Sequence, residues 1–544
     1  MENYWKQPLP HGRGLRRFLS RARKQAVLGV FQPAPSAHRA PDRLPPAAEF
    51  LLVVCALCVL VGLAAFWCYR NTYILYYGDA QSHLNLSRSI IDSRTPGYDQ
   101  LGTVWLPVLH LICLPFVGNT SLWSSGLAGT IPVASCFIAA GLFFYYAALE
   151  VYSSRIAAAA VLACLALNPN VMYLATIPMT EIVFAAGLGA MLFSILRFRS
   201  TQRARYLSLG IFASWFMSLT RYDGWFLIPF SALAFAFFAK QHALRTLIVF
   251  GAAASLAPLY WCAHNWWETS NPLDFYNGPY SAMAIQGGKP YRGYHDWLVA
   301  AQYYAKAGEL CAGWGLAALG FVGLVCAALK KFLAPIGFLL LVPAFYIWSI
   351  HSSGLPIHVP QLWPHSYYNT RYGIAMVFVA AFAAGAIPSL LPQQAKRYAC
   401  LLPVLAIAPW LEHFSPEHWI CWKESQVNSD SRREWTRNAA HFLAGQYVRS
   451  SGILTMSGSG DMAGIFCRAG IPLSETLHEG NGPEWLAATR RPDLYHPTLW
   501  AVAQMGDVVA KSLGRPGFSA YALTREIRTK DDPALEIFRR DTPK

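Results

Sequence analysis

Charged side chains are scarce in this sequence. Lysine, arginine, aspartate and glutamate together make up 13% of its 544 residues, whereas 54% of the residues are apolar. Several apolar runs approach or exceed the ~20 residues that a helix needs to cross a bilayer. The composition therefore excludes an ordinary soluble protein and indicates a polytopic membrane protein.

Acidic residues are scarcer than basic residues, which gives a formal net charge of +15. Such a surplus can indicate a nucleic-acid-binding protein. Here, however, the lysines and arginines cluster at the ends of apolar runs, where positive charge fixes topology at the cytoplasmic face. We therefore expect the lipid bilayer as a partner and no nucleic acid.

The twelve cysteines include no CxxC pair and no other firm metal-ligand spacing. Ten of them lie in or beside apolar segments, where cysteine usually acts as a small packing residue. Only Cys421 and Cys467 fall in the polar C-terminal region, where a disulfide is possible in an oxidising compartment.

Residues 1–47 contain no segment that can bury a core, because they are basic and then rich in proline. We interpret them as a flexible cytoplasmic tail. The apolar run that follows is too long and too far from the start for an ordinary cleaved signal peptide, so we expect an uncleaved anchor.

Eleven apolar runs are candidate membrane spans. They lie near 48–69, 121–149, 156–175, 178–196, 206–220, 224–239, 246–263, 311–329, 332–350, 372–392 and 398–412. With the tail in the cytoplasm, every second connection should also be cytoplasmic. These connections hold Arg155; Arg197, Arg199, Arg203 and Arg205; Lys240 and Arg245; Lys330 and Lys331; and Lys396 and Arg397. The positive charges thus agree with one orientation throughout.

This agreement requires that the apolar segment 104–118 does not cross the membrane. The segment is short and contains two prolines and a histidine, which suits an interfacial or re-entrant helix. The predicted membrane domain, 48–412, then has outer loops at 70–120, 264–310 and 351–371. The remaining residues, 413–544, are predicted to lie outside.

Residues 413–544 have a different pattern. "GILTMSGS" and "TLWAVAQMG" predict strands, whereas "PEWLAATR" and "GDVVAKSLG" predict helices, which together indicate a small α/β domain. The glycines of "GSGDMAG" (458–464) lack the G-x-G-x-x-G spacing of a dinucleotide site. We interpret this stretch as a turn from a strand to a helix.

Seven charged residues from distant parts of the chain fall at the predicted outer ends of the spans. They are Asp79, Glu181, Arg221, Asp223, Glu268, Asp274 and Arg371. A charged side chain inside the bilayer costs about 2.5–3.5 kcal/mol on insertion scales, so such residues usually face a water-filled cavity or a partner. Their common level predicts a single outer site.

Each of these residues also has a simpler interpretation. Asp79 can cap a helix that begins at Ala80, and Glu181 can be an acid favoured at a helix start. Arg221 and Asp223 can form an interfacial ion pair beside an aromatic belt. His83, one helical turn after Asp79, suits an ordinary hydrogen-bonded ring better than a metal ligand.

The combination of acids, arginines and tryptophan-rich outer loops favours a cavity for a sugar and an anionic head group. Arginine binds phosphate through paired donors, and aromatic rings stack on the apolar faces of sugars. The motifs "YYGDAQSHL", "WLPVLHLICLPFVG", "PMTE", "TRYDGW" and "NTRYG" occur in this order between residue 48 and about 412. In these motifs the chain resembles the GT-C superfamily, integral-membrane glycosyltransferases that use polyprenyl-phosphate sugars, especially the bacterial aminoarabinose transferase and protein O-mannosyltransferases.

The resemblance implies a GT-C fold and a location in the bacterial inner membrane, and the predicted topology makes the C-terminal domain extracytoplasmic. It also implies that Asp79, the acid in the first outer loop, is the catalytic base. Many relatives have a second acid beside the first, whereas this chain has Ala80 and Gln81. We therefore expect a one-carboxylate mechanism without a metal or other cofactor.

The donor implied by the resemblance is a polyprenyl-phosphate sugar, and the acceptor is an envelope glycan, lipid or protein. Arg221 and Arg371 are the predicted ligands of the leaving phosphate. The predicted substrate-binding set is completed by His83, Glu181, Asp223, Glu268, Lys289, His358 and Asn369.

Two other classes of function remain open. A transporter or flippase for a lipid-linked sugar also needs outer arginines and a cavity, but it predicts inverted repeats and polar residues at the bilayer midplane, and neither is evident. A non-enzymatic assembly protein would use its outer domain to bind a partner. Release of polyprenyl phosphate from a sugar donor is expected only of a transferase.

Overall fold

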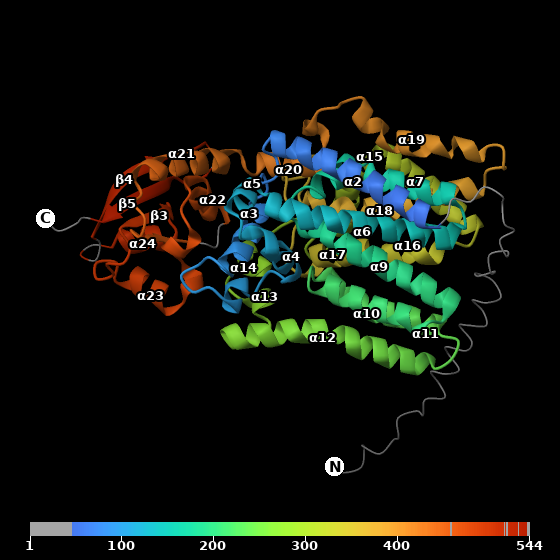
Figure 1. The fold of residues 1–544 in the computed structure, drawn as a ribbon, viewed down its shortest axis with the longest axis horizontal. Helices are drawn as coiled ribbons and strands as arrows, with labels where there is room; N and C mark the ends of the chain where they lie inside the picture. Colours follow the sequence, from blue (N-terminus) through green and yellow to red (C-terminus); the bar gives the residue numbers. More distant parts are fainter. Residues whose placement is uncertain (1–45, 457–459, 516, 518–519, 531, 541–544) are drawn as a thin grey trace, which may run out of the picture.

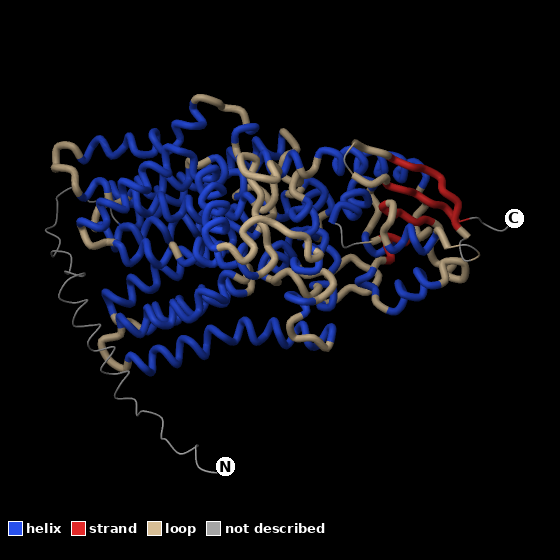
Figure 2. The backbone as a smooth tube through the Cα atoms, turned by 180° about the vertical axis from the view of Figure 1, so that it is seen from behind, coloured by secondary structure: helices blue, strands red, loops and turns tan. Residues whose placement is uncertain are grey.

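The computed structural model describes residues 46–456, 460–515, 517, 520–530 and 532–540. The predicted tail, residues 1–47, therefore lies almost wholly outside the described residues, as does part of the predicted turn at 458–464. The described chain has three regions along its longest axis (Figures 1 and 2). A bundle of long helices forms one end, short helices and loops form the middle, and a β-sheet with its own helices forms the other end.

The bundle contains the helices α2 (Pro46–Arg70), α6 (Leu127–Tyr152), α7 (Arg155–Ala166), α8 (Pro169–Leu174), α9 (Thr180–Thr201), α10 (Ala204–Ser218), α11 (Asp223–Phe238), α12 (Ala243–Thr269), α15 (Trp297–Leu329), α16 (Leu333–Leu339), α17 (Leu341–Ser352), α18 (Ile374–Ala384) and α19 (Leu401–Leu411). All eleven predicted apolar runs are therefore helical. In the described part of the chain, seven helical segments are long and apolar enough to cross a membrane. The number of spans remains a prediction, because the other runs form shorter helices.

The predicted span 156–175 does not form one continuous helix. It is broken into α7 and α8 at Asn168, whose side chain accepts hydrogen bonds from the amides of Asn170 and Val171. Asn168 thus caps α8, and Pro169 occupies the first helical position, where a missing amide hydrogen costs nothing.

The middle region contains α3 (Gly78–Ser89), α4 (Val108–Val117), α5 (Thr120–Ser125), α13 (Asp274–Asn277), α14 (Ala282–Gln286) and α20 (Ile420–Val427). The segment predicted not to cross the membrane forms α4. Its ten residues span about 15 Å, half of the hydrocarbon core of a bilayer.

The sheet contains β1 (Ile453–Thr455), β2 (Thr476–Leu477), β3 (Trp500–Gln504), β4 (Tyr521–Ile527) and β5 (Leu535–Arg540) in the order β2-β1-β3-β5-β4. β1 is parallel to β2 and β3, whereas β5 is antiparallel to β3 and β4. The surrounding helices are α21 (Asp430–Gln446), α22 (Gly460–Ala469), α23 (Pro483–Arg490) and α24 (Val508–Leu513). The two predicted strands and two predicted helices are confirmed as β1, β3, α23 and α24.

The sheet region is attached to the middle region through α3 and the loop after it. α22 packs against α3, and Arg94 forms an ion pair of 2.8 Å with Glu484. The side chain of Asn481 donates to the Thr95 hydroxyl at 3.1 Å. All twelve cysteines are free, so Cys421 and Cys467 are not joined.

Candidate active site

Asp79 lies in the first turn of α3, at the boundary between the bundle and the middle region. Its carboxylate Oδ2 accepts a hydrogen bond of 2.6 Å from Nη2 of Arg371, which is 292 positions further along the chain. The Asp79 side chain remains 42% exposed. The carboxylate thus pairs with a distant arginine and still faces solvent, and helix capping does not account for its position.

Arg371 uses each nitrogen of its guanidinium group to bind a different carboxylate. It lies in the 3₁₀ turn η2 (Thr370–Gly373) directly before α18. Nε donates to Oε1 of Glu181 at 3.1 Å, and Nη1 donates to Oε1 of Glu424 at 3.0 Å. Nη2 binds Asp79, as described above. The arginine side chain is only 8% exposed, so these carboxylates replace the water that it would otherwise bind.

Glu181 joins this arginine to a second one. It lies in the first turn of α9, is 2% exposed, and its Oε1 also accepts from Nη1 of Arg221 at 3.2 Å. Arg221 lies just before α11, and Asp223 lies in the first turn of that helix. Nε of Arg221 is 3.4 Å from Oδ1 of Asp223. The Tyr346 hydroxyl closes this part of the network, because it accepts from Arg221 at 2.8 Å and donates to Asp223 at 3.0 Å.

Six charged residues therefore form one connected network, which we call the ionic cluster: Asp79, Glu181, Arg221, Asp223, Arg371 and Glu424. Four of its members lie in or just before the first turn of a helix: Asp79 of α3, Glu181 of α9, Asp223 of α11 and Arg371 before α18. The N-terminal ends of helices carry partial positive charge, which favours anionic groups nearby. The convergence of these helix starts explains how three acids from distant sequence positions share one site.

Aromatic rings enclose the two guanidinium groups. Tyr372 lies between them, with its ring centre 4.7 Å from Arg221 and 5.1 Å from Arg371. Tyr77 covers Arg371 at 4.9 Å. Cation–π contacts of this kind stabilise a desolvated arginine and restrict its orientation.

Glu424 is the member of the cluster that the sequence did not reveal. It lies on α20, after the last apolar helix, and is 1% exposed. Its second oxygen, Oε2, accepts from the backbone amide of Arg371 at 2.9 Å. Burial raises the pKa of the Glu424 carboxyl, while the adjacent Arg371 opposes this shift.

Helix α20 is fixed to the bundle by hydrogen bonds on either side of Glu424. The Cys421 amide donates to Oδ1 of Asn170 at 3.0 Å, and the Cys421 carbonyl accepts from the Tyr77 hydroxyl at 2.8 Å. The hydroxyls of Tyr173 and Ser425 are 2.8 Å apart. These contacts hold the Glu424 carboxylate against Arg371.

His83 lies near the ionic cluster but has a different partner. Its side chain is buried, with Nδ1 at 2.9 Å from Nε2 of His110 and its ring packed against Trp105. Burial lowers the pKa of His83 to about 3, with a smaller contribution from the two arginines of the cluster. This neutral ring matches the simpler interpretation, a hydrogen-bonded histidine.

In the described part of the chain, no hydrogen bond or ion pair joins the other predicted substrate-binding residues to the ionic cluster. Glu268, on α12, interacts with Asp99. Lys289 is exposed after α14. His358 pairs through its backbone with Tyr368, and the Asn369 side chain donates to the Pro356 carbonyl at 3.1 Å. Their roles in substrate binding remain predictions.

A small cavity lies between α9, α17 and α18 and is lined at one end by residues of the ionic cluster. Its polar end is formed by Glu181, Arg221, Asp223 and Tyr346, and the rest of its lining is apolar. Oε2 of Glu181 is buried there without a hydrogen-bond partner among the described residues. A donor group on a ligand can satisfy this oxygen.

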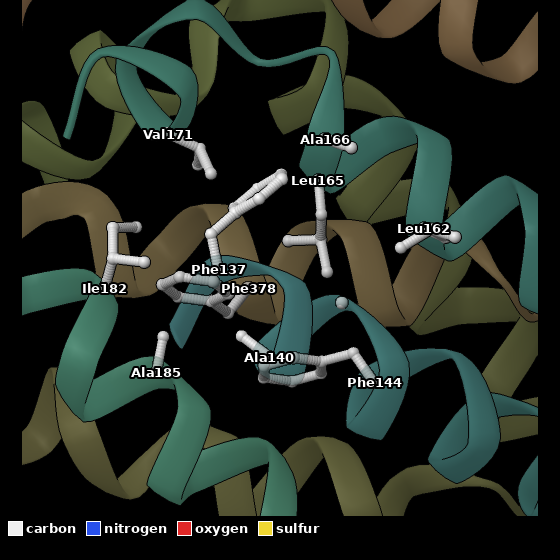
Figure 3. A pocket seen from close by; sticks show the side chains of 11 residues that line it. Phe137, Ala140, Phe144, Leu162, Leu165, Ala166, Val171, Ile182, Ala185 and Phe378 are labelled. Carbon is white, nitrogen blue, oxygen red and sulfur yellow. The ribbon is translucent and has the colours of Figure 1, made fainter. Parts of the chain in front are cut away.

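A second cavity lies among residues of α6, α7, α8, α9 and α18 (Figure 3). The side chains that line it are all apolar, including Phe137, Phe144 and Phe378. Such a cavity offers no polar side chain to a ligand. Within the described ranges, no group of three or more His, Cys, Asp or Glu residues is arranged to hold a metal ion.

Comparison with solved structures identifies the fold. The crystal structure of ArnT from Cupriavidus metallidurans in the apo state matches with a TM-score of 0.51 and 12% sequence identity, over 91% of this chain and 98% of ArnT. The apo oligosaccharyltransferase of Archaeoglobus fulgidus matches with a TM-score of 0.48 and 12% identity, over 84% of this chain and 69% of that chain. No family model matches the sequence, and no curated protein sequence matches it.

The chain therefore has the fold of ArnT, in agreement with the GT-C fold that the sequence motifs predicted. Together with the seven apolar helices, this likeness identifies an integral membrane protein.

Proposed function

We propose that the protein is an inverting glycosyltransferase that moves a sugar from a polyprenyl-phosphate donor to an extracytoplasmic acceptor. One observation carries this proposal: the partly exposed carboxylate of Asp79 pairs with the buried Arg371, which Glu181 joins to a second buried arginine, Arg221. The likeness to ArnT, a membrane glycosyltransferase, supports it. A glycan, lipid or protein of the cell envelope is the expected acceptor.

Asp79 is the catalytic base in this mechanism. It is the one carboxylate of the ionic cluster with substantial exposure, at 42%, whereas Glu181 and Glu424 are 2% and 1% exposed. The acceptor hydroxyl loses its proton to Asp79 while its oxygen forms a bond to the anomeric carbon. The bond from that carbon to the phosphate oxygen breaks on the opposite face, and its electrons leave with the polyprenyl phosphate. A single displacement inverts the configuration and needs one base.

The arginines stabilise the leaving group. When the sugar departs, a phosphodiester becomes a phosphomonoester and gains negative charge. Arg371 and Arg221 are held permanently charged beside this position, and guanidinium groups bind phosphate oxygens through paired donors. Because their geometry is fixed by buried carboxylates and tyrosine rings, little reorganisation is needed at the transition state.

The buried acids orient the arginines and the sugar. Glu181 binds both arginines, Asp223 binds Arg221, and Glu424 binds Arg371. The unpaired Oε2 of Glu181 is the acceptor that we assign to a hydroxyl of the donor sugar. The sheet region, which contacts α3, is placed to contribute to acceptor selection on the outer face.

The test is release of polyprenyl phosphate from a polyprenyl-phosphate sugar by the purified protein in lipid nanodiscs. We expect release with the wild type and a loss of at least about 100-fold with Asp79→Asn, because general-base catalysis contributes about 10²–10⁴-fold. Glu434→Gln removes one exposed acid of α21 and serves as the matched control with normal turnover. Turnover by Asp79→Asn at the wild-type rate would exclude Asp79 as the base.

The same purified protein, reconstituted into liposomes, tests the alternative, a flippase. A flippase moves the intact lipid-linked sugar between the leaflets of a liposome and leaves the sugar–phosphate bond unbroken. Translocation without any release of polyprenyl phosphate would replace the transferase proposal.

A further inference from the structure

The ionic cluster presents a conflict for the proposed reaction. Nη2 of Arg371 donates to Asp79 at 2.6 Å. The proposed base and the proposed phosphate ligand are therefore hydrogen-bonded to each other. A carboxylate oxygen that accepts from a guanidinium is less available to an acceptor hydroxyl. The N–H of Nη2 that donates to Asp79 cannot donate to the donor phosphate at the same time.

The three carboxylates around Arg371 are not equivalent. Glu181 and Glu424 are 2% and 1% exposed, whereas Asp79 is 42% exposed. Glu181 is fixed on α9 and also binds Arg221. Glu424 binds both the guanidinium and the backbone amide of Arg371. Two of the three contacts therefore hold the arginine in place, and only the contact with Asp79 faces solvent.

We propose that Nη2 of Arg371 is exchanged between Asp79 and the donor phosphate, so that donor binding frees the base. Glu181 and Glu424 keep Nε and Nη1 of the arginine fixed during this exchange. This inference rests on the proposed function and adds an order of events. The carboxylate becomes available to an acceptor hydroxyl only after a phosphate has entered.

The energetics are compatible with reversible exchange. Asp79 is 42% exposed, so water competes for its carboxylate, and an ion pair of this kind changes an equilibrium constant by at most about fivefold. The phosphodiester of the donor is a monoanion, like the carboxylate, and it offers the same N–H a charge-assisted hydrogen bond of the same kind. Separating Arg371 from Glu424 would instead leave a buried carboxylate without its arginine partner, which is far less favourable.

The exchange makes a prediction opposite to that for an ordinary ligand-binding residue. A weaker hydrogen bond between residue 79 and Arg371 should let the phosphate bind more tightly. The neutral amide introduced by Asp79→Asn is a weaker acceptor than a carboxylate, and the methyl group introduced by Asp79→Ala offers no acceptor. We expect the affinity for polyprenyl phosphate to rise by up to about fivefold in Asp79→Ala and by less in Asp79→Asn, although both variants lose transfer.

The experiment measures the Kd of polyprenyl phosphate for the full-length protein in nanodiscs, with polyprenol as the ligand that lacks phosphate. Glu434→Gln controls for the general effect of removing one negative charge from the outer face. Tighter binding confined to the two Asp79 variants and to the phosphorylated ligand supports the exchange. Equal tightening in Glu434→Gln overturns it, because the effect would then be general electrostatics.

Unchanged or weaker binding in both Asp79 variants also overturns the exchange. If the wild type still releases polyprenyl phosphate from the sugar donor, the proposed function survives that result. If the wild type neither binds polyprenyl phosphate nor releases it, the proposed function fails, and the exchange fails with it.

Discussion

Replacing Arg371 by glutamine removes the common partner of three carboxylates. Asp79 is half-exposed and can be solvated by water, but Glu181 and Glu424 are almost completely buried. Breaking a buried ion pair by removing one partner typically costs about 3–5 kcal/mol, because the remaining charge is left uncompensated. We therefore expect Arg371→Gln to lower the apparent Tm of the detergent-solubilised protein by several degrees.

Glu424 allows this cost to be assigned to a particular contact. In Arg371→Gln, Glu181 keeps its ion pair with Arg221, whereas Glu424 loses its arginine partner. The double variant Arg371→Gln/Glu424→Gln replaces this carboxylate by a neutral amide of similar size. Residues in direct contact show coupling energies of about 0.5–3 kcal/mol. We expect the double variant to be more stable than the sum of the two single effects by an amount in the upper half of that range.

The assay is thermal unfolding followed by tryptophan fluorescence, with all four proteins in the same detergent. Arg528→Gln is the control, since Arg528 is 75% exposed and its ion pair with Glu526 lies on the surface; we expect its Tm to equal that of the wild type. Strictly additive effects of Arg371→Gln and Glu424→Gln would refute the reasoning, because they would show that the two side chains are not energetically coupled.

Two further predictions concern packing and pH. A Cβ atom on Gly373 would lie 2.3 Å from the Ala307 backbone, whereas one on Gly337 would meet no atom within 4 Å. Gly373→Ala should therefore push the Arg371 turn away from α15 and reduce transfer at least about tenfold, with Gly337→Ala as a normal control; equal activities would contradict this close approach. His83 has a folded-state pKa of about 3, below the ~6.5 of an unfolded histidine, so the unfolded chain binds a proton that the folded chain excludes. Stability should fall as the pH falls below about 6.5 towards 3, and His83→Gln should flatten the dependence of Tm on pH over this window; an identical dependence would show that His83 is not responsible.

The membrane bundle was predictable because hydrocarbon imposes a strong constraint on sequence. Apolar runs had to be helical, and each of them is. The same constraint revealed Asp79, Glu181, Arg221, Asp223 and Arg371, since charges at the ends of apolar helices are costly unless they meet a partner. Sequence alone gave their common level, and the structure supplied the contacts that join them.

Glu424 escaped prediction because it lies in a polar stretch, where a single acid carries no apparent cost. Only the folding of α20 back onto Tyr77, Asn170 and Tyr173 buries it. The hairpin of β4 and β5 was missed for a related reason. β4 is an edge strand whose central residues are mostly exposed, so "YALTREI" lacks the alternation that identifies a half-buried strand.

The position of Glu424 in the chain has a consequence for biosynthesis. Every apolar helix of the bundle precedes it, so the ribosome has completed all of them before this carboxylate emerges. Until then Arg371 lacks one of its two buried counterions, and the proposed phosphate ligand is not yet fixed. A nascent or truncated chain that ends at α19 would contain the whole apolar bundle and still lack one acid of the proposed catalytic centre, which delays its completion until α20 has been synthesised.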